Sequence, residues 1–238
     1  MIELLARREC LRVVPDMGPA DVVVKVEAIL GLHGVGRDPI GAIRLPLDKL
    51  IPSRIILRRP ARFKGPRAGR ADIYFSFGDW DKAAADYATY LTAHPTAWLG
   101  HQRRGVCLHN LNDLRGAISA YERTIELNPR SLTAYNNLAW IRATSPDAGI
   151  RDGAKAVDHA KKAVELAGQE KPWLYMDTLA VACAEAGEFR QAVDLLTKAL
   201  ALMTKPEDRK DRPEMEARLK LFQQGKPFRE KLGPDRRP

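Results

Sequence analysis

The clearest unit of the chain contains Leu111-Asn112-Asp113-Leu114-Arg115-Gly116-Ala117 and ends at Asn128-Pro129. Asparagine tolerates the positive φ that ends a helix, and an aspartate after it can accept from free N–H groups at the start of the next helix. Proline cannot continue a helix, so we expect the second helix to end before Pro129. The stretch therefore predicts a helix, a tight turn and a second helix.

The pattern recurs between Ala71 and Thr204 at intervals of roughly 34 residues, a repeat length typical of helix–turn–helix units. Aligned segments start at Lys64, Trp98, Leu132 and Trp173. A small residue occupies the eighth position of each: Ala71, Gly105, Ala139 and Ala180. Alanine occupies the twentieth position, or in the third segment a position five places later: Ala83, Ala117, Ala156 and Ala192. Because only small side chains let two helix backbones approach closely, these positions predict helix crossings.

Two further stretches repeat the turn, namely Gly78-Asp79-Trp80-Asp81-Lys82-Ala83 and Gly187-Glu188-Phe189-Arg190-Gln191-Ala192. Together with the first stretch, they resemble the tetratricopeptide repeat family. The later units are similar to a bacterial subgroup of this family without a defined activity. The stretches that carry this similarity are Asn136-Asn137-Leu138-Ala139-Trp140, Ser145-Pro146-Asp147 and Gly225-Lys226-Pro227-Phe228-Arg229-Glu230. The resemblance implies a mainly α fold, a right-handed α-solenoid of about four repeats.

These features divide the chain into four parts. We expect residues 1–63 to form a small β-rich module or fragment, because β-branched stretches occur at 22–30, 42–47 and 54–58. Residues 64–204 form the solenoid, with units at 64–97, 98–131, 132–172 and 173–204. Residues 205–225 form a capping helix that covers the last apolar face, with Met215, Leu219, Leu221 and Phe222 on one side. Residues 226–238 form a basic tail that we expect to be frayed.

Two places depart from the repeat pattern. Arg67 and Arg70 stand where apolar residues normally pack, so we expect the first helix to start late, near Gly69. Residues 145–149 lengthen the turn of the third unit, either as a tolerated surface insertion or as a specific contact.

The net charge of +9 is unevenly distributed. Residues 1–70 hold 14 Lys and Arg against 7 Asp and Glu, whereas residues 71–204 hold 14 against 16. A basic patch precedes and enters the first repeat: Arg54, Arg58, Arg59, Arg62, Lys64, Arg67 and Arg70. It is either a solvated linker or a contact for phosphate or an acidic partner. Only Phe63 is placed to stack on a base, which disfavours RNA.

Catalytic and metal-binding motifs are not recognisable in the sequence. The five histidines have no metal-ligand spacing, and no cysteine belongs to a nucleophile signature. The Gly31–Gly36 loop lacks the residues of a phosphate loop and is interpreted as a turn. Cys107 and Cys183 are expected in the core. No apolar run reaches the roughly 18 residues of a membrane span. We therefore expect a cytoplasmic protein that is not an enzyme and needs no cofactor.

The resemblance also implies where a ligand would bind, because the first helices of such units line a concave groove. Its contact positions correspond here to Phe75, Gln102, Arg103, His109, Asn136, Asn137, Trp140 and Asp177. For Trp140 the alternative is packing between neighbouring units. The carboxylate clamp of the chaperone-binding branch is not matched in either register, which offers Ala68, Asp72, Arg103, Thr133 and Asn137, or Gln102, Val106, Asn137, Leu174 and Thr178.

We expect a scaffold or adaptor that binds a peptide or protein segment in this groove without catalysis. The alternative is that the basic linker and tail bind nucleic acid or another acidic surface, with the repeats as support. The identity of the partner and the oligomeric state stay open.

Overall fold

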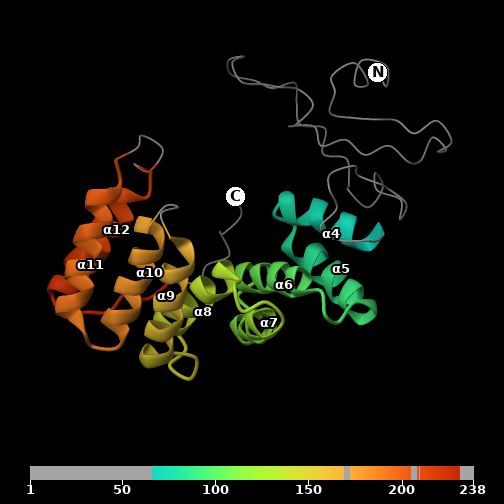
Figure 1. Ribbon diagram of the computed structural model, residues 1–238, viewed down its shortest axis with the longest axis horizontal. Helices are drawn as coiled ribbons and strands as arrows, with labels where there is room; N and C mark the ends of the chain where they lie inside the picture. The colour runs from blue at the N-terminus through green and yellow to red at the C-terminus, as the bar shows by residue number, and fades with distance from the viewer. Residues whose placement is uncertain (1–65, 169–171, 205–207, 209, 231–238) are drawn as a thin grey trace, which may run out of the picture.

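The computed structural model describes residues 66–168, 172–204, 208 and 210–230 (Figure 1). Within these ranges the chain is helical and contains no strand. The helices are α4 (Pro66–Ser76), α5 (Trp80–Ala93), α6 (Trp98–Asn110), α7 (Leu114–Leu127), α8 (Leu132–Thr144), α9 (Gly153–Ala167), α10 (Pro172–Glu185), α11 (Phe189–Leu202) and α12 (Arg212–Gln223). The β-rich module expected at residues 1–63 lies outside the described residues.

Helix α4 begins at Pro66, earlier than the start near Gly69 that the sequence suggested. The expectation was wrong because Arg70 does not need an apolar neighbour. Its guanidinium binds both carboxylate oxygens of Asp86 on α5, at 2.5 and 2.6 Å. Proline is also favoured at the first position of a helix, where its missing N–H has no partner to lose.

The small residues lie where the helices cross, as predicted. The alanines at the eighth and twentieth repeat positions are fully buried, with 0% of their surface exposed: Ala71, Ala83, Ala117, Ala139, Ala156, Ala180 and Ala192. Gly105 on α6 faces the ring of Tyr121 on α7. A Cβ atom added to Gly105 would lie 2.7 Å from Cε1 of that ring, so even alanine is too large at this crossing.

The turns within three units have the predicted backbone. Gly78, Asn112 and Gly187 adopt φ values of 71°, 62° and 84°. The side chain of Asp113 accepts a hydrogen bond from the backbone N–H of Gly116 and caps α7. Asp79 and Glu188 also stand at the N-cap position, but neither side chain accepts a capping bond from the described residues. In the third unit Ser131 and Asp152 cap α8 and α9 instead.

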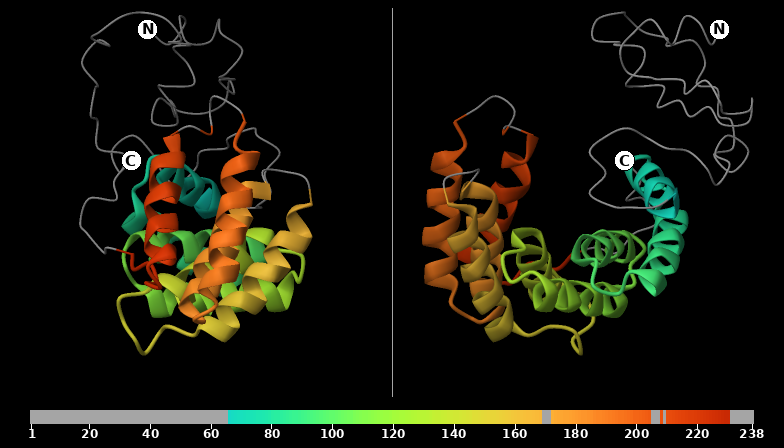
Figure 2. Two further views of the ribbon diagram at one scale, coloured as in Figure 1. Left: turned by 90° about the vertical axis from the view of Figure 1, so that its left-hand side faces the viewer. Right: turned by 45° about the vertical axis from the view of Figure 1, so that its right-hand side comes forward.

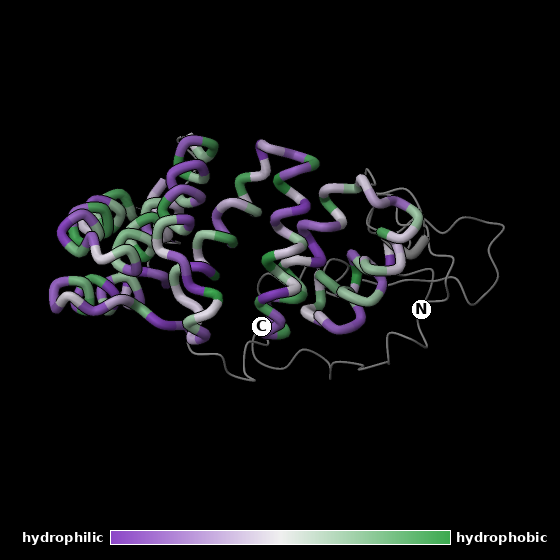
Figure 3. The backbone as a smooth tube through the Cα atoms, turned by 90° about the horizontal axis from the view of Figure 1, so that it is seen from below, coloured by the Kyte–Doolittle hydropathy of each residue, from purple (hydrophilic) through white to green (hydrophobic). Residues whose placement is uncertain are grey.

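Helix α8 joins two apolar clusters. Ala134, Leu138 and Ile141 pack into the cluster of α4 to α7, while Ala139 and Ala143 pack into the cluster of α9 to α12. Hydrophobic and hydrophilic positions alternate along the helices in Figure 3, as expected when each helix buries only part of its surface. A single helix thus connects the two halves of the solenoid.

The helix pairs stack into an arc, with α4 and α5 at one end and α11 and α12 at the other (Figure 2). The first helices approach one another, α4 beside α6 and α8 beside α10, so they lie on the inner side of the arc. No helix in the described ranges is long and apolar enough to cross a membrane.

Helix α12 covers the end of the solenoid, and Met215 and Phe222 are buried beneath it. Gly225 then turns the chain with a φ of 66°, and residues 226–230 return to α8. The backbone N–H of Glu230 donates to the carbonyl oxygen of Thr144 at 2.9 Å. The expectation that the tail frays from residue 226 was therefore wrong for Lys226–Glu230, because these residues have specific partners on the solenoid. Residues 231–238 lie outside the described residues.

Candidate peptide-binding groove

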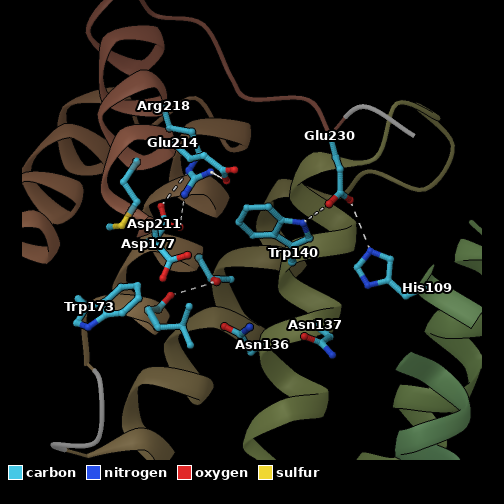
Figure 4. A pocket seen from close by; sticks show the side chains of 13 residues that line it. His109, Asn136, Asn137, Trp140, Trp173, Asp177, Asp211, Glu214, Arg218 and Glu230 are labelled. Atoms are coloured by element: carbon cyan, nitrogen blue, oxygen red, sulfur yellow. Dashed lines mark hydrogen bonds and ion pairs between the residues drawn. The ribbon is translucent and has the colours of Figure 1, made fainter. Parts of the chain in front are cut away.

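A pocket of about 350 Å³ opens on the inner side of the arc, between α6, α8, α10 and α12 (Figure 4). It gathers five of the eight residues predicted for the groove: His109, Asn136, Asn137, Trp140 and Asp177. Helix α12 contributes Glu214, Met215 and Arg218, its N-cap residue Asp211 lies beside them, and the returning tail contributes Glu230. Because these residues come from segments far apart in sequence, the stacking of the helices creates the pocket.

Trp140 stands in the wall of this pocket and contacts α12 and the tail. Its indole N–H donates to Oε1 of Glu230 at 2.9 Å, and its ring centroid lies 5.9 Å from that of Phe228. The guanidinium of Arg218 lies 5.6 Å from the centre of the same ring. Trp140 therefore serves in packing, against the cap and tail, while part of its ring still lines the pocket.

The two asparagines of α8 differ in their bonding. The side-chain N–H₂ group of Asn137 donates to the hydroxyl oxygen of Tyr121 at 2.9 Å, which fixes its orientation. The side-chain oxygen of Asn136 is buried and has no hydrogen-bond partner among the described residues. A buried polar atom without a partner is energetically costly, so a ligand N–H group that reaches this oxygen would gain a hydrogen bond.

Asp177 lies in the pocket, but its carboxylate already forms an ion pair with Arg218. Both carboxylate oxygens receive hydrogen bonds from Arg218, at 3.1 and 2.7 Å, and the two side chains are only 7% and 8% exposed. Burial raises the pKa of Asp177, and the Arg218 guanidinium opposes this rise. The pair joins α10 to α12, so its first role is structural.

Sequence reasoning missed Arg218, although a signal for it was present. Arg218 lies between Met215 and Phe222 at helical spacing, on the side of α12 that was interpreted as apolar. A lone arginine on a buried helix face requires a buried partner, and Asp177 provides it.

Three predicted groove residues lie away from this pocket. Gln102 accepts a hydrogen bond from the hydroxyl of Ser131 at 2.7 Å, which ties α6 to the next repeat. Arg103 forms an ion pair with Asp72 and lies 5.6 Å from the ring centre of Phe75. Equivalent positions of successive repeats thus do not all line one pocket, because the repeats lie at different places along the arc.

His109 lies close to the carboxylate of the tail. Its Nε2 atom is 3.5 Å from Oε2 of Glu230, and its side chain is 14% exposed. No group of three or more His, Cys, Asp or Glu residues that could hold a metal ion is found in the part of the chain that the structure describes.

The basic patch is described only at its carboxyl end. Arg54, Arg58, Arg59, Arg62 and Lys64 lie outside the described residues, and the side chain of Arg67 does too. Arg70 is paired with Asp86, and this partner raises the pKa of the Arg70 guanidinium. The charge of Arg70 is thus largely neutralised by the fold.

The lengthened turn of the third unit makes contacts within the molecule. Arg151 donates to the carbonyl oxygens of Ser145 and Pro146 and pairs with Glu185 at 3.0 Å. Asp147 accepts from the backbone N–H of Gly149 and pairs with Arg115 at 3.2 Å. The insertion is therefore held against α10 and the second unit.

Comparison with known proteins identifies the class. Family models described as tetratricopeptide repeat match residues 68–121 and 108–171 in one case and residues 176–210 in another. The chain therefore belongs to the tetratricopeptide repeat family, and its general role is that of a protein-interaction scaffold. A search of curated protein sequences found no match.

Solved structures support the same fold. The crystal structure of the MamA protein has a TM-score of 0.50 and 18% identity, over 67% of this chain and 89% of that one. The crystal structure of PilW, described as a widely conserved type IV pilus biogenesis factor, has a TM-score of 0.51 and 17% identity. That match covers 67% of this chain and 74% of PilW. At these identities the likeness concerns the fold.

Proposed function

We propose that this protein is a non-catalytic scaffold that binds an extended segment of another protein in the groove beside Trp140. The observation that carries the proposal is the position of Pro227–Glu230, which lie in non-helical form against α8. A non-helical segment of the chain itself thus lies against the surface that we propose for the partner. A cytoplasmic location remains part of the proposal.

The chemistry of the pocket supports this function. Asn136 presents a buried acceptor, and Trp140 presents an aromatic wall, the two kinds of group that bind the backbone and an anchor side chain of an extended peptide. The alternative, a nucleic-acid site in the basic patch, has less support because Arg70 is already paired with Asp86.

The test is a binding titration with any protein captured by the full-length chain. Asn136→Lys places a long side chain in the pocket and removes the free acceptor, so we expect binding at least tenfold weaker. Gln191→Lys adds the same charge to an exposed position of α11 and should leave the affinity unchanged. A partner that binds Asn136→Lys as tightly as the wild type would contradict groove binding.

A further inference from the structure

The segment Lys226–Glu230 is bound to the solenoid in the manner of a ligand. It lies about 90 residues from α8 along the chain, yet it contacts α8 and α10 with both backbone and side chains. Each of its last three side chains meets a different chemical environment on the solenoid surface. The segment therefore shows which kinds of side chain this surface accommodates.

Phe228 occupies the aromatic position. Its ring lies 5.9 Å from that of Trp140, and the guanidinium of Arg218 lies 5.5 Å from its centre. The same guanidinium contacts the Trp140 ring, so one buried cation serves both aromatic faces. An aromatic side chain is the anchor that this position fits.

Arg229 occupies an acidic position. Its guanidinium pairs with Glu185 at the end of α10, at 2.5 Å, and donates to the carbonyl oxygen of Ala143 at 3.4 Å. Glu185 is 11% exposed at its side chain and also binds Arg151. The carbonyl oxygens at the end of α8 add negative potential there, so this position accommodates a basic side chain beside Arg151.

Glu230 occupies a position that captures a carboxylate. Its side chain is 5% exposed and accepts from the Trp140 indole N–H at 2.9 Å. The Thr144 hydroxyl, which donates to the carbonyl oxygen of Trp140 at 2.8 Å, lies 3.5 Å from the same carboxylate. His109 approaches the same carboxylate at 3.5 Å (Figure 4). A buried carboxylate is tolerated only where a donor binds it, as the Trp140 indole N–H does here.

The tether that joins this segment to α12 is built to open. Gln223, Gln224, Gly225 and Lys226 are exposed, and a Cβ atom added to Gly225 would meet no atom within 4 Å. The backbone N–H groups of Gly225 and Lys226 donate to the carbonyl oxygens of Phe222 and Leu221, so displacement of Phe228–Glu230 requires rotation beyond Lys226. Such a rotation leaves in place the buried residues that anchor α12, namely Met215, Arg218 and Phe222.

We propose that Phe228-Arg229-Glu230 is an intramolecular ligand of the groove. Its external competitor is a protein segment with the same order of side chains: aromatic, basic, acidic. This inference rests on the proposed function and names the partner's chemistry. Because a short tether holds a ligand at millimolar effective concentration, a partner reaches the surface covered by Phe228 and Glu230 only by displacing the tail, whereas the pocket beside Asn136 is open with the tail in place.

The test uses the full-length chain and a synthetic peptide with the sequence of residues 225–230, acetylated and amidated. The readout is the NMR signal of the Trp140 indole N–H, assigned with Trp140→Phe. In the wild type we expect the peptide to leave this signal unchanged. In the double variant Phe228→Ala with Glu230→Ala, the signal should move, and added peptide should return it to the wild-type position.

The variant should bind the peptide at least tenfold more tightly than the wild type, and a peptide with Phe replaced by Ala should not bind. A folded variant that ignores the peptide would overturn the proposal, because the tail would then be a fixed brace. If the double variant does not fold, Phe228→Ala alone is measured in the same way. Loss of the fold in both variants likewise overturns it.

This outcome is separable from the test of groove binding. A partner that still depends on Asn136, together with a peptide that fails to bind, would retain the groove and exclude the tail as its ligand. A partner whose affinity does not depend on Asn136, together with a peptide that binds, would exclude partner binding beside Asn136. It would retain the tail as a displaceable ligand of the solenoid.

Discussion

At the scale of single residues, the fold depends on how closely neighbouring helices approach. Gly105 on α6 has the ring of Tyr121 where a Cβ atom would be, and Tyr121 is fully buried. Its ring cannot move aside easily, because its hydroxyl also accepts from Asn137 on α8. One missing side chain thus permits a contact that links three helices.

We therefore predict that Gly105→Ala lowers the free energy of unfolding by about 1–3 kcal/mol, the usual cost of overpacking a core. Gly100→Ala on the same helix is the matched control. Its Cβ would meet Cδ2 of Leu91 at 3.0 Å, the tip of a flexible side chain. There the higher helix propensity of alanine should leave stability unchanged or raised by up to about 1 kcal/mol. Urea denaturation of both variants measures the difference, and equal stabilities would contradict the packing argument.

The buried ion pair gives a second prediction at this scale. Arg218→Ala leaves the carboxylate of Asp177 buried without its partner, so we expect a loss of about 3–5 kcal/mol. Lys220→Ala, at an exposed position of α12, should change stability little. Combining Arg218→Met with Asp177→Leu should recover most of the loss, because the second change removes the stranded charge. A single variant as stable as the wild type would show that the pair contributes nothing.

At the scale of helices, caps and turns were the features most open to prediction. Asn112 and Asp113 stand at fixed places in the repeat, and their roles are local, so the sequence alone indicated them. The cap at Asp152 was missed because the insertion in the third unit shifts its second helix. The cap at Ser131 was missed because it precedes the first helix of a unit, outside the turns that the repeat pattern marks. Caps and turns can therefore be predicted from the sequence where the repeat spacing is regular.

Asp152 provides the pH-dependent prediction. The backbone N–H of Lys155 lowers the pKa of Asp152 below its usual 3.8, so the cap stabilises the fold fully above that pH. This contribution is lost as the pH falls through the lower, folded-state pKa. We expect Asp152→Ala to cost about 1 kcal/mol near neutral pH and less in acid. Asp152→Asn should keep most of the cap and show no such acid loss, as thermal unfolding at several pH values would reveal.

At the scale of the whole molecule, the sequence predicted the repeats but not what fills the groove. Small residues at a regular period indicate stacked helices without any knowledge of distant contacts. The return of Phe228 and Glu230 to α8 joins residues far apart in the chain, and no period encodes it. The same holds for the ion pair of Asp177 with Arg218, which joins α10 to α12 while Asp177 also lines the pocket.

The stacked helices and the tail together form the walls of the pocket. The first helices provide the pocket, α12 closes one side of it, and the tail covers Trp140. In this arrangement the scaffold presents Asn136 on its inner surface and Gln191 among the exposed positions of α11.

Site-specific photo-crosslinking tests the central claim most directly. A photoreactive amino acid is placed at position 136 in one full-length sample and at position 191 in another, and each is irradiated with the bound partner. We predict that position 136 yields crosslinks confined to one short segment of the partner, and that position 191 yields few. Crosslinks that form at position 191 and not at position 136 would contradict binding in the groove.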